Sequence, residues 1–176
     1  WMNSSSLTNV TLYLMTQLQK GDTAPTFKLE STRGEISLKD LQGSWTVLYF
    51  YPKDNTPGCT AQACNFRDAL PGMNAKVIGV SADDMNSHEK FENDFSLPFP
   101  LASDPDNAIS KAYGAFGKKN MYGKEYEGII RSTFIIDPKG KIADARYNVK
   151  ADQDTDVVQK TLLSLQQEGG NVGEHA

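Results

Sequence analysis

The segment that most constrains the fold is residues 45–51, a nearly continuous run of β-branched and aromatic side chains that Pro52 ends. A strand with one solvated face alternates apolar and polar residues, whereas this run offers apolar side chains to both faces. We therefore predict a strand buried on both sides, as in sheets that helices cover on both faces. Residues 75–81 and 131–136 have the same character and are also expected to be central strands.

Helical and turn signals separate these strands. Apolar spacing and flanking Gly and Pro residues predict helices at residues 59–70, 83–95, 106–113 and 152–167. Further expected elements are an N-terminal β-hairpin at 27–31 and 35–38, a helical turn at 38–41, strands at 99–102 and 141–147, and a long polar loop at 117–123. The alternation predicts an α/β domain with a central mixed β-sheet flanked by helices.

Length and charge narrow the class of protein. The 176 residues are the size of one domain, which we place at 18–167, with an N-terminal extension at 1–17 and a flexible C-terminal tail at 168–176. The net charge of −4 argues against nucleic acid as a partner. No membrane is expected as a partner, because the apolar run at 10–15 is far shorter than the ~20 residues of a membrane span. That run also lacks the basic flank of a signal peptide.

The chain contains two cysteines, Cys59 and Cys64, and two histidines, His88 and His175. Two cysteines are too few for a disulfide-stapled scaffold or a four-cysteine zinc site, and the histidines lie far from them in the sequence. We therefore expect no metal site, and the close pair of cysteines needs another explanation.

Cys59 follows the cysteine loop, residues 52–58, which leads from the buried strand into a helix. In an open α/β sheet, ligands bind beyond the carboxyl ends of the strands. The unpaired N–H groups and the dipole of a first helical turn favour an anion such as a thiolate. Thr56 offers a hydroxyl one turn earlier, and Pro52 and Pro57 stiffen the loop. The alternative is an inert buried cysteine, which the Thr-Pro-Gly sequence before Cys59 disfavours.

The spacing of the two cysteines sets a geometric condition. On an intact α-helix, five residues rise about 7.5 Å and turn about 140°, which places the Cα atoms roughly 9 Å apart. A disulfide needs Cα atoms within about 7 Å. A Cys59–Cys64 disulfide therefore requires the first one or two turns to unwind. Simple packing of Cys64 in an Ala-rich helix is the alternative, and the spacing does not match the C-x-x-C pattern of dithiol oxidoreductases.

Several motifs together resemble those of the peroxiredoxins. The family motif Pro-x-x-x-Thr/Ser-x-x-Cys stands here as Pro52, Thr56 and Cys59. The longer string at residues 51–64 is similar to the bacterioferritin comigratory protein (Q-type) subfamily. The resemblance extends over about residues 18–165, and further matches lie at residues 21–27, 79–81 and 128–137.

The resemblance implies a thioredoxin-like fold and a role for each matching residue. Cys59 corresponds to the peroxidatic cysteine, Thr56 to the hydroxyl that hydrogen-bonds thiolate and peroxide, and Pro52 to the residue that shields the site from water. Arg131 corresponds to the arginine that stabilises the thiolate and orients the peroxide, although its own sequence context indicates only a surface cation. Cys64 corresponds to the resolving cysteine of many Q-type members, while other members place that cysteine elsewhere or lack it.

The implied activity is that of a thiol-dependent peroxidase acting on hydrogen peroxide and alkyl hydroperoxides. Cys59 would become a sulfenic acid, Cys64 would resolve it as an intramolecular disulfide, and thioredoxin or a similar dithiol would regenerate the enzyme. No metal, haem or flavin is expected. The resemblance and the absence of a signal peptide suggest a cytoplasmic monomer. Two other hypotheses are a thioredoxin-fold thiol-disulfide oxidoreductase and a non-catalytic binding or chaperone module.

Overall fold

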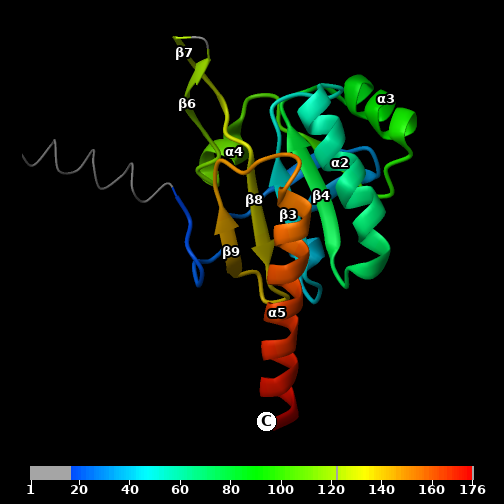
Figure 1. Cartoon of the computed structure of the whole chain (residues 1–176), viewed down its shortest axis with the longest axis vertical. Helices are drawn as coiled ribbons and strands as arrows, with labels where there is room; N and C mark the ends of the chain where they lie inside the picture. The colour runs from blue at the N-terminus through cyan, green and yellow to red at the C-terminus, as the bar shows by residue number, and fades with distance from the viewer. Residues whose placement is uncertain (1–16, 122, 176) are drawn as a thin grey trace, which may run out of the picture.

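The computed structural model describes residues 17–121 and 123–175, so the expected extension at 1–17 lies almost entirely outside the described residues. The described strands form a seven-stranded sheet in the order β2-β1-β5-β4-β3-β8-β9 and a two-stranded sheet, β6-β7 (Figure 1). Their bounds are β1 Lys28–Ser31, β2 Gly34–Ser37, β3 Thr46–Phe50, β4 Lys76–Ser81, β5 Leu101–Ser103, β6 Phe116–Met121, β7 Lys124–Ile129, β8 Ser132–Ile136 and β9 Ile142–Arg146.

Helices cover the large sheet. They are α2 Pro57–Ala69, α3 Met85–Phe95, α4 Ala108–Ala112 and α5 Asp154–His175, with short 3₁₀ turns η1 Lys39–Leu41 and η2 Leu70–Gly72. Figure 1 shows α2 and α5 together on one face of the sheet, and the two helices are in contact. No helix in the described part of the chain is long and apolar enough to cross a membrane.

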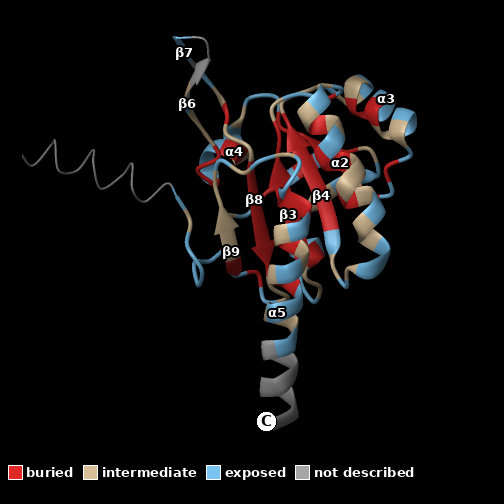
Figure 2. Cartoon of the chain, in the orientation of Figure 1, coloured by how far each residue is buried: buried red, intermediate tan, exposed pale blue. Residues whose placement is uncertain are grey.

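The central strand β3 is buried on both faces, as predicted, and every one of its residues is buried. Its alternating side chains enter two separate core clusters. Val47 and Tyr49 pack in the cluster beneath α2, α3 and α5, whereas Leu48 and Phe50 pack in the opposite cluster, which Tyr113 at the end of α4 joins. Figure 2 shows the strands of the sheet centre buried between more exposed helices. The absence of a solvated face explains why the run at 45–51 does not alternate.

Strand directions bring distant loops to one edge of the sheet. β3 runs parallel to β4, and β4 runs parallel to β5, so the loops after these three strands emerge on the same side. β8 is antiparallel to β3, and the pairing of Phe50 with Ser132 places the start of β8 beside the end of β3. Arg131, which precedes β8, therefore lies next to the cysteine loop although it is far from it in sequence.

The predicted mixed α/β sheet and its N-terminal hairpin are confirmed, since β1 and β2 pair as antiparallel neighbours. The long loop expected at 117–123 is wrong. β6 and β7 form an antiparallel hairpin there, in which Phe116 pairs with Ile129 at the base and Gly123 adopts a positive φ of 79° near the turn. Pairing uses only backbone N–H and C=O groups, so polar side chains do not prevent a two-stranded ribbon.

The helix boundaries also differ from the predictions by a few residues, and the differences at α2 and α5 bear on the site and on the end of the chain. α2 begins at Pro57 rather than at residue 59, because Pro suits the first helical turn, where its missing N–H is not needed. α5 is assigned to His175, whereas the helix was expected to end at residue 167. The division of the chain into an extension, a domain and a tail stays a prediction.

Candidate active site

Cys59 lies in the first turn of α2. Thr56 precedes the helix with an extended backbone (φ −83°, ψ 153°), and Pro57 starts it. The N–H group of Cys59 is thus one of those that an α-helix leaves without an internal partner. The Cys59 side chain is only 1 % exposed and packs in the core cluster beneath α2. The fold therefore delivers a thiol to the positive end of a helix dipole in a nearly dry environment.

Arg131 reaches this thiol directly. Its Nη2 donates a hydrogen bond to Cys59 Sγ at 3.3 Å, and its Nη1 donates one to Gln62 Oε1 at 2.6 Å. Gly58 leaves room for the guanidinium, because a Cβ atom on Gly58 would lie 3.3 Å from Arg131 Nη2. The structure thus brings together Cys59 and the arginine that the family resemblance selected. The guanidinium therefore lies where it can stabilise negative charge that develops when this sulfur reacts.

A buried chain of hydrogen bonds holds Arg131 from behind. Gln62 Nε2 donates to Asp154 Oδ2 at 2.9 Å, and Thr133 Oγ1 donates to the same oxygen at 2.6 Å. Burial raises the pKa of Asp154, and this effect outweighs the two hydrogen bonds, which lower the pKa. Gln62 and Asp154 were not predicted from the sequence. The available signal was the spacing of Gln62 three residues after Cys59, which places both side chains on one helix face.

Lys119 on β6 adds a second positive charge near the site. Its Nζ donates to the carbonyl of Ile129 at 2.8 Å, close to Arg131 in the chain. The pKa of Lys119 is lowered, first by desolvation and then by the charge of Arg131, whereas Cys59 raises it. Arg131 and Cys59 thus both act on Lys119 electrostatically. Lys119 was predicted to lie in a polar loop, so its proximity to the site was not foreseen.

Thr56 and Pro52 flank Cys59 on the cysteine loop. The Thr56 hydroxyl donates a hydrogen bond to the carbonyl of Lys53 at 3.0 Å. Contact with a peroxide would require this hydroxyl to turn toward Cys59, so its implied role stays a prediction. Pro52 is half-buried directly after the fully buried Tyr51, and its shielding role also stays a prediction.

Cys64 is half-buried, and both cysteines are free. Because both lie within α2, which is continuous from Pro57 to Ala69, the helical spacing of roughly 9 Å between their Cα atoms applies. Arg67 lies close to Cys64. The pKa of Arg67 is raised first by its hydrogen bond to Asp68 and then by the charge of Cys64. The structure therefore holds the predicted pair in a form that cannot bond without rearrangement.

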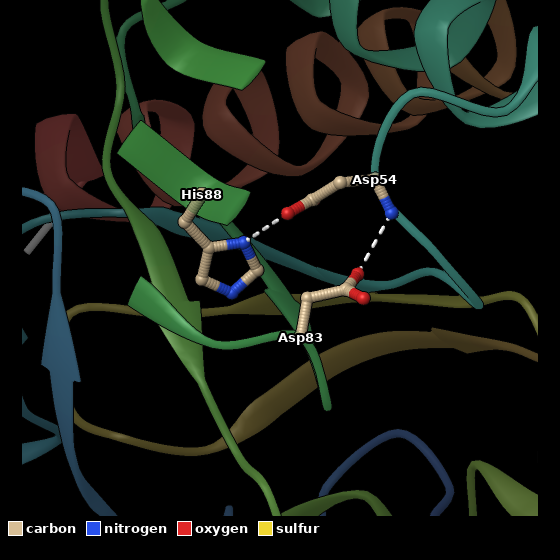
Figure 3. Close-up of side chains that lie close together, drawn as sticks. All are labelled: Asp54, Asp83 and His88. Carbon is tan, nitrogen blue, oxygen red and sulfur yellow. Dashed lines mark hydrogen bonds and ion pairs between the residues drawn. The ribbon is translucent and has the colours of Figure 1, made fainter. Parts of the chain in front are cut away.

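A second polar cluster lies under the cysteine loop (Figure 3). Asp54 on the loop, Asp83 after β4 and His88 on α3 have potential metal-ligand atoms within 4.8 Å of one another. These atoms already have hydrogen-bond partners, since His88 Nδ1 meets Asp54 Oδ2 at 2.7 Å and Asp83 Oδ2 accepts from the N–H of Asp54 at 2.7 Å. Hydroxyls of Ser81 and Ser87 complete the bonding. The cluster is better explained as a structural network than as a metal centre.

Comparison with known proteins agrees with this geometry. The family model described as AhpC/TSA family matches residues 20–145. Peroxiredoxin Bcp of Bacillus subtilis is 40 % identical over 152 residues, which cover 84 % of this chain and 97 % of the relative. Peroxiredoxin Bcp of Escherichia coli is 40 % identical over 148 residues, covering 82 % of this chain and 95 % of the relative.

Solved structures give the same result for the fold. Peroxiredoxin Q of Xanthomonas campestris superimposes with a TM-score of 0.74 at 40 % identity, covering 78 % of this chain and 90 % of that one. A Cys-to-Ser mutant of PrxQ from Xylella fastidiosa superimposes with a TM-score of 0.79 at 36 % identity, covering 85 % and 98 %. The predicted thioredoxin-like fold is therefore confirmed, and the chain belongs to the AhpC/TSA family, within which it is a peroxiredoxin of the Bcp and peroxiredoxin Q group.

Proposed function

We propose that this chain is a thiol-dependent peroxidase that reduces hydrogen peroxide and organic hydroperoxides. The observation that carries the proposal is the hydrogen bond of 3.3 Å from Arg131 Nη2 to Cys59 Sγ at the first turn of α2. The peroxiredoxin relatives support it, and alkyl peroxide reduction activity is ascribed to the bacterioferritin comigratory protein of Xanthomonas campestris, a structural neighbour. The site offers a nucleophile with positive charge beside it, which is what attack on a peroxide needs.

In the first step, the Cys59 thiolate attacks the terminal oxygen of the peroxide. The S–O bond forms as the O–O bond breaks, so that Cys59 is oxidised to a sulfenic acid and the peroxide is reduced. The departing hydroxide or alkoxide takes up a proton and leaves as water or an alcohol. Arg131 and the free N–H groups of the first turn stabilise the negative charge that moves onto the oxygens. Thr56 would bind thiolate and peroxide, and Pro52 would exclude water.

In the second step, the Cys64 thiolate attacks the sulfur of the Cys59 sulfenic acid. The S–S bond forms, the S–O bond breaks, and hydroxide leaves as water after taking up a proton. The first turns of α2 must unwind for the two sulfurs to meet. Thioredoxin or a similar dithiol then reduces the disulfide by thiol–disulfide exchange. The chemistry involves sulfur and oxygen only, and the cytoplasmic location and monomeric state stay predictions.

Mass spectrometry after one equivalent of hydrogen peroxide tests the proposal. We expect the mass to fall by about 2 Da with Cys59 linked to Cys64, as two thiols lose their hydrogens. Cys59→Ser should abolish peroxide consumption. Cys64→Ser should still react once and keep a sulfenic acid on Cys59, detectable by a dimedone adduct. Undiminished turnover by Cys59→Ser would rule out the mechanism, and disulfide reduction without peroxide would instead favour an oxidoreductase.

A further inference from the structure

A fully buried acid–base pair connects the cysteine loop to α3. Asp54 Oδ2 lies 2.7 Å from His88 Nδ1, and the two side chains are 1 % and 0 % exposed, respectively. Figure 3 shows a ring nitrogen of His88 pointing at the Asp54 carboxyl group. Neither residue touches Cys59 through a described hydrogen bond, so the peroxidase mechanism above makes no use of them.

The hydrogen-bond partners determine how many protons the pair holds. His88 Nε2 lies 3.0 Å from the carbonyl oxygen of Ala102, which only accepts, so Nε2 carries a proton. Nδ1 faces a carboxyl oxygen, and a second proton must lie between these two atoms for a hydrogen bond to form. The Asp54 carboxyl group also accepts from the hydroxyls of Tyr51 and Ser87. The pair therefore holds one proton on Nε2 and one in the hydrogen bond between Nδ1 and the Asp54 carboxyl group.

The remaining contacts of Asp54 all join the loop to parts of the fold that the disulfide would not displace. Tyr51 follows β3, Ser87 belongs to α3, and Asp83 accepts the N–H of Asp54 at 2.7 Å from the loop after β4. Asn55 then turns the chain with a left-handed backbone, φ 62°, only four residues before Cys59. Asparagine is one of the non-glycine residues that adopt this conformation readily, so the loop turns at Asn55 without marked backbone strain.

We propose that Asp54 and His88 are positioning residues that hold the cysteine loop in its peroxide-reactive conformation. The role rests on the proposed function. Arg131 and Gln62 hold the start of α2 from one side, while the Asp54–His88 pair holds the preceding loop from the other. Release of the pair frees the loop, which shifts the balance from the intact helix that attacks peroxide toward the unwound helix that forms the disulfide.

The first test measures the loop without peroxide. In the reduced protein, amide hydrogen exchange of residues 53–60 should accelerate about tenfold or more in Asp54→Ala, because His88 Nδ1 and the hydroxyls of Tyr51 and Ser87 lose their buried hydrogen-bond partner. Asp54→Asn is the conservative variant, since its amide can donate to a neutral His88 Nδ1, and it should restore most of the protection. Asp94→Ala, which removes an exposed carboxylate from the same helix as His88, is the matched control and should exchange like the wild type.

NMR of the histidine ring supplies a readout that a purely structural role would not produce. We expect a proton signal from the hydrogen bond between His88 Nδ1 and Asp54 in the wild type, and a ring proton on Nε2 alone in Asp54→Asn. A wild-type spectrum without a proton between His88 Nδ1 and Asp54 would overturn the proton assignment. Unchanged exchange at residues 53–60 in Asp54→Ala would overturn the positioning role.

The second test connects the pair to turnover. Asp54→Ala should slow the first oxidation of Cys59 by about tenfold while leaving the disulfide step unchanged or faster, whereas Asp94→Ala should alter neither. An unchanged first step would contradict the proposal. A wild type that consumes no peroxide would refute the proposed function instead, and the exchange and NMR results would still decide whether the pair holds the loop.

Discussion

Arg131 makes two bonds with one planar group, and this geometry should matter to the reaction. Its guanidinium bridges Cys59 Sγ at 3.3 Å and Gln62 Oε1 at 2.6 Å. Arg131→Met should lower the rate constant for Cys59 oxidation by about a hundredfold, because the main cation of the site is lost. Arg131→Lys keeps the charge but lacks the two nitrogens of the planar guanidinium that reach Cys59 and Gln62 separately, so its rate should lie between those of Met and Arg. Stopped-flow measurement with hydrogen peroxide checks this order, and equal rates for Met and Lys would contradict it.

Asp154 makes the stability of the protein depend on pH in a direction opposite to that of a typical surface acid. Burial raises its pKa in the folded protein above the unfolded value, so the folded state binds this proton more tightly. As the pH rises from about 4 through the folded pKa, ionisation of Asp154 destabilises the fold. Each unit of such a shift is worth about 1.4 kcal/mol.

The Asn variant isolates this effect. Asp154→Asn keeps an oxygen for Gln62 and Thr133 but does not ionise. The free energy of unfolding of the wild type, measured in urea, should therefore fall relative to that of Asp154→Asn as the pH rises across this window. The difference should be constant below the unfolded pKa. A wild type that gains stability over the variant with rising pH would contradict the assignment.

Some residues of the site could be predicted from the sequence and others could not. Cys59 was recognised from its place between a buried strand and a helix, and Arg131 only from the family resemblance. Gln62 and Asp154 are 92 residues apart and meet only because α2 packs on α5. Asp54 and His88 likewise meet through the packing of α3 against the sheet. These hydrogen bonds join residues that are far apart in the sequence, so no local sequence pattern predicts them.

At the scale of elements, hydrophobic pattern was most informative where a strand is buried on both sides. The bounds of strands β3, β4 and β8 agree with the predictions to within a residue or two. Each of these strands coincides with a short, continuous apolar run, which is typical of a strand buried on both faces. The β6-β7 hairpin was not predicted, because its strands pair through main-chain groups and their polar side chains show no strand pattern. The sequence also predicts α2, but the helix starts two residues before residue 59 because Pro57 occupies its first turn.

Gly79 shows how tightly two of these strands pack. A Cβ atom there would lie 2.9 Å from Cζ and Oη of Tyr49 and 3.0 Å from Cδ2 of Leu101. Gly79→Ala should therefore destabilise the protein by about 1–3 kcal/mol, because Tyr49 must move within a filled core. Gly72→Ala is the control, since nothing lies within 4 Å of its Cβ position and its backbone is not left-handed. Thermal unfolding should separate the two variants, and equal midpoints would show that the core at Tyr49 can yield.

Contacts from several elements hold both the first turn of α2, which carries Cys59, and the loop before it. The helix is connected to Arg131 before β8 and to Asp154 on α5 through Gln62. The preceding loop is connected to α3 through the pair of Asp54 and His88. Cys59, Gln62 and Ala63 are almost completely buried in the same stretch. Reaction of Cys59 with Cys64 must break much of this packing, so the intact fold opposes the second step of the proposed cycle.

Oxidation should consequently make the whole molecule less stable. After one equivalent of hydrogen peroxide, the thermal midpoint should lie about 2–8 °C below that of the reduced protein, because a loss of about 1–2 kcal/mol shifts a domain of this size by that much. Cys64→Ser treated in the same way acquires only the sulfenic acid and should keep its midpoint within about a degree, since its helix need not unwind. Calorimetry of both proteins with and without dithiothreitol makes the comparison. A disulfide form that melts above the reduced form would contradict this prediction, because the constraint of the cross-link on the unfolded chain would then outweigh the cost of unwinding α2.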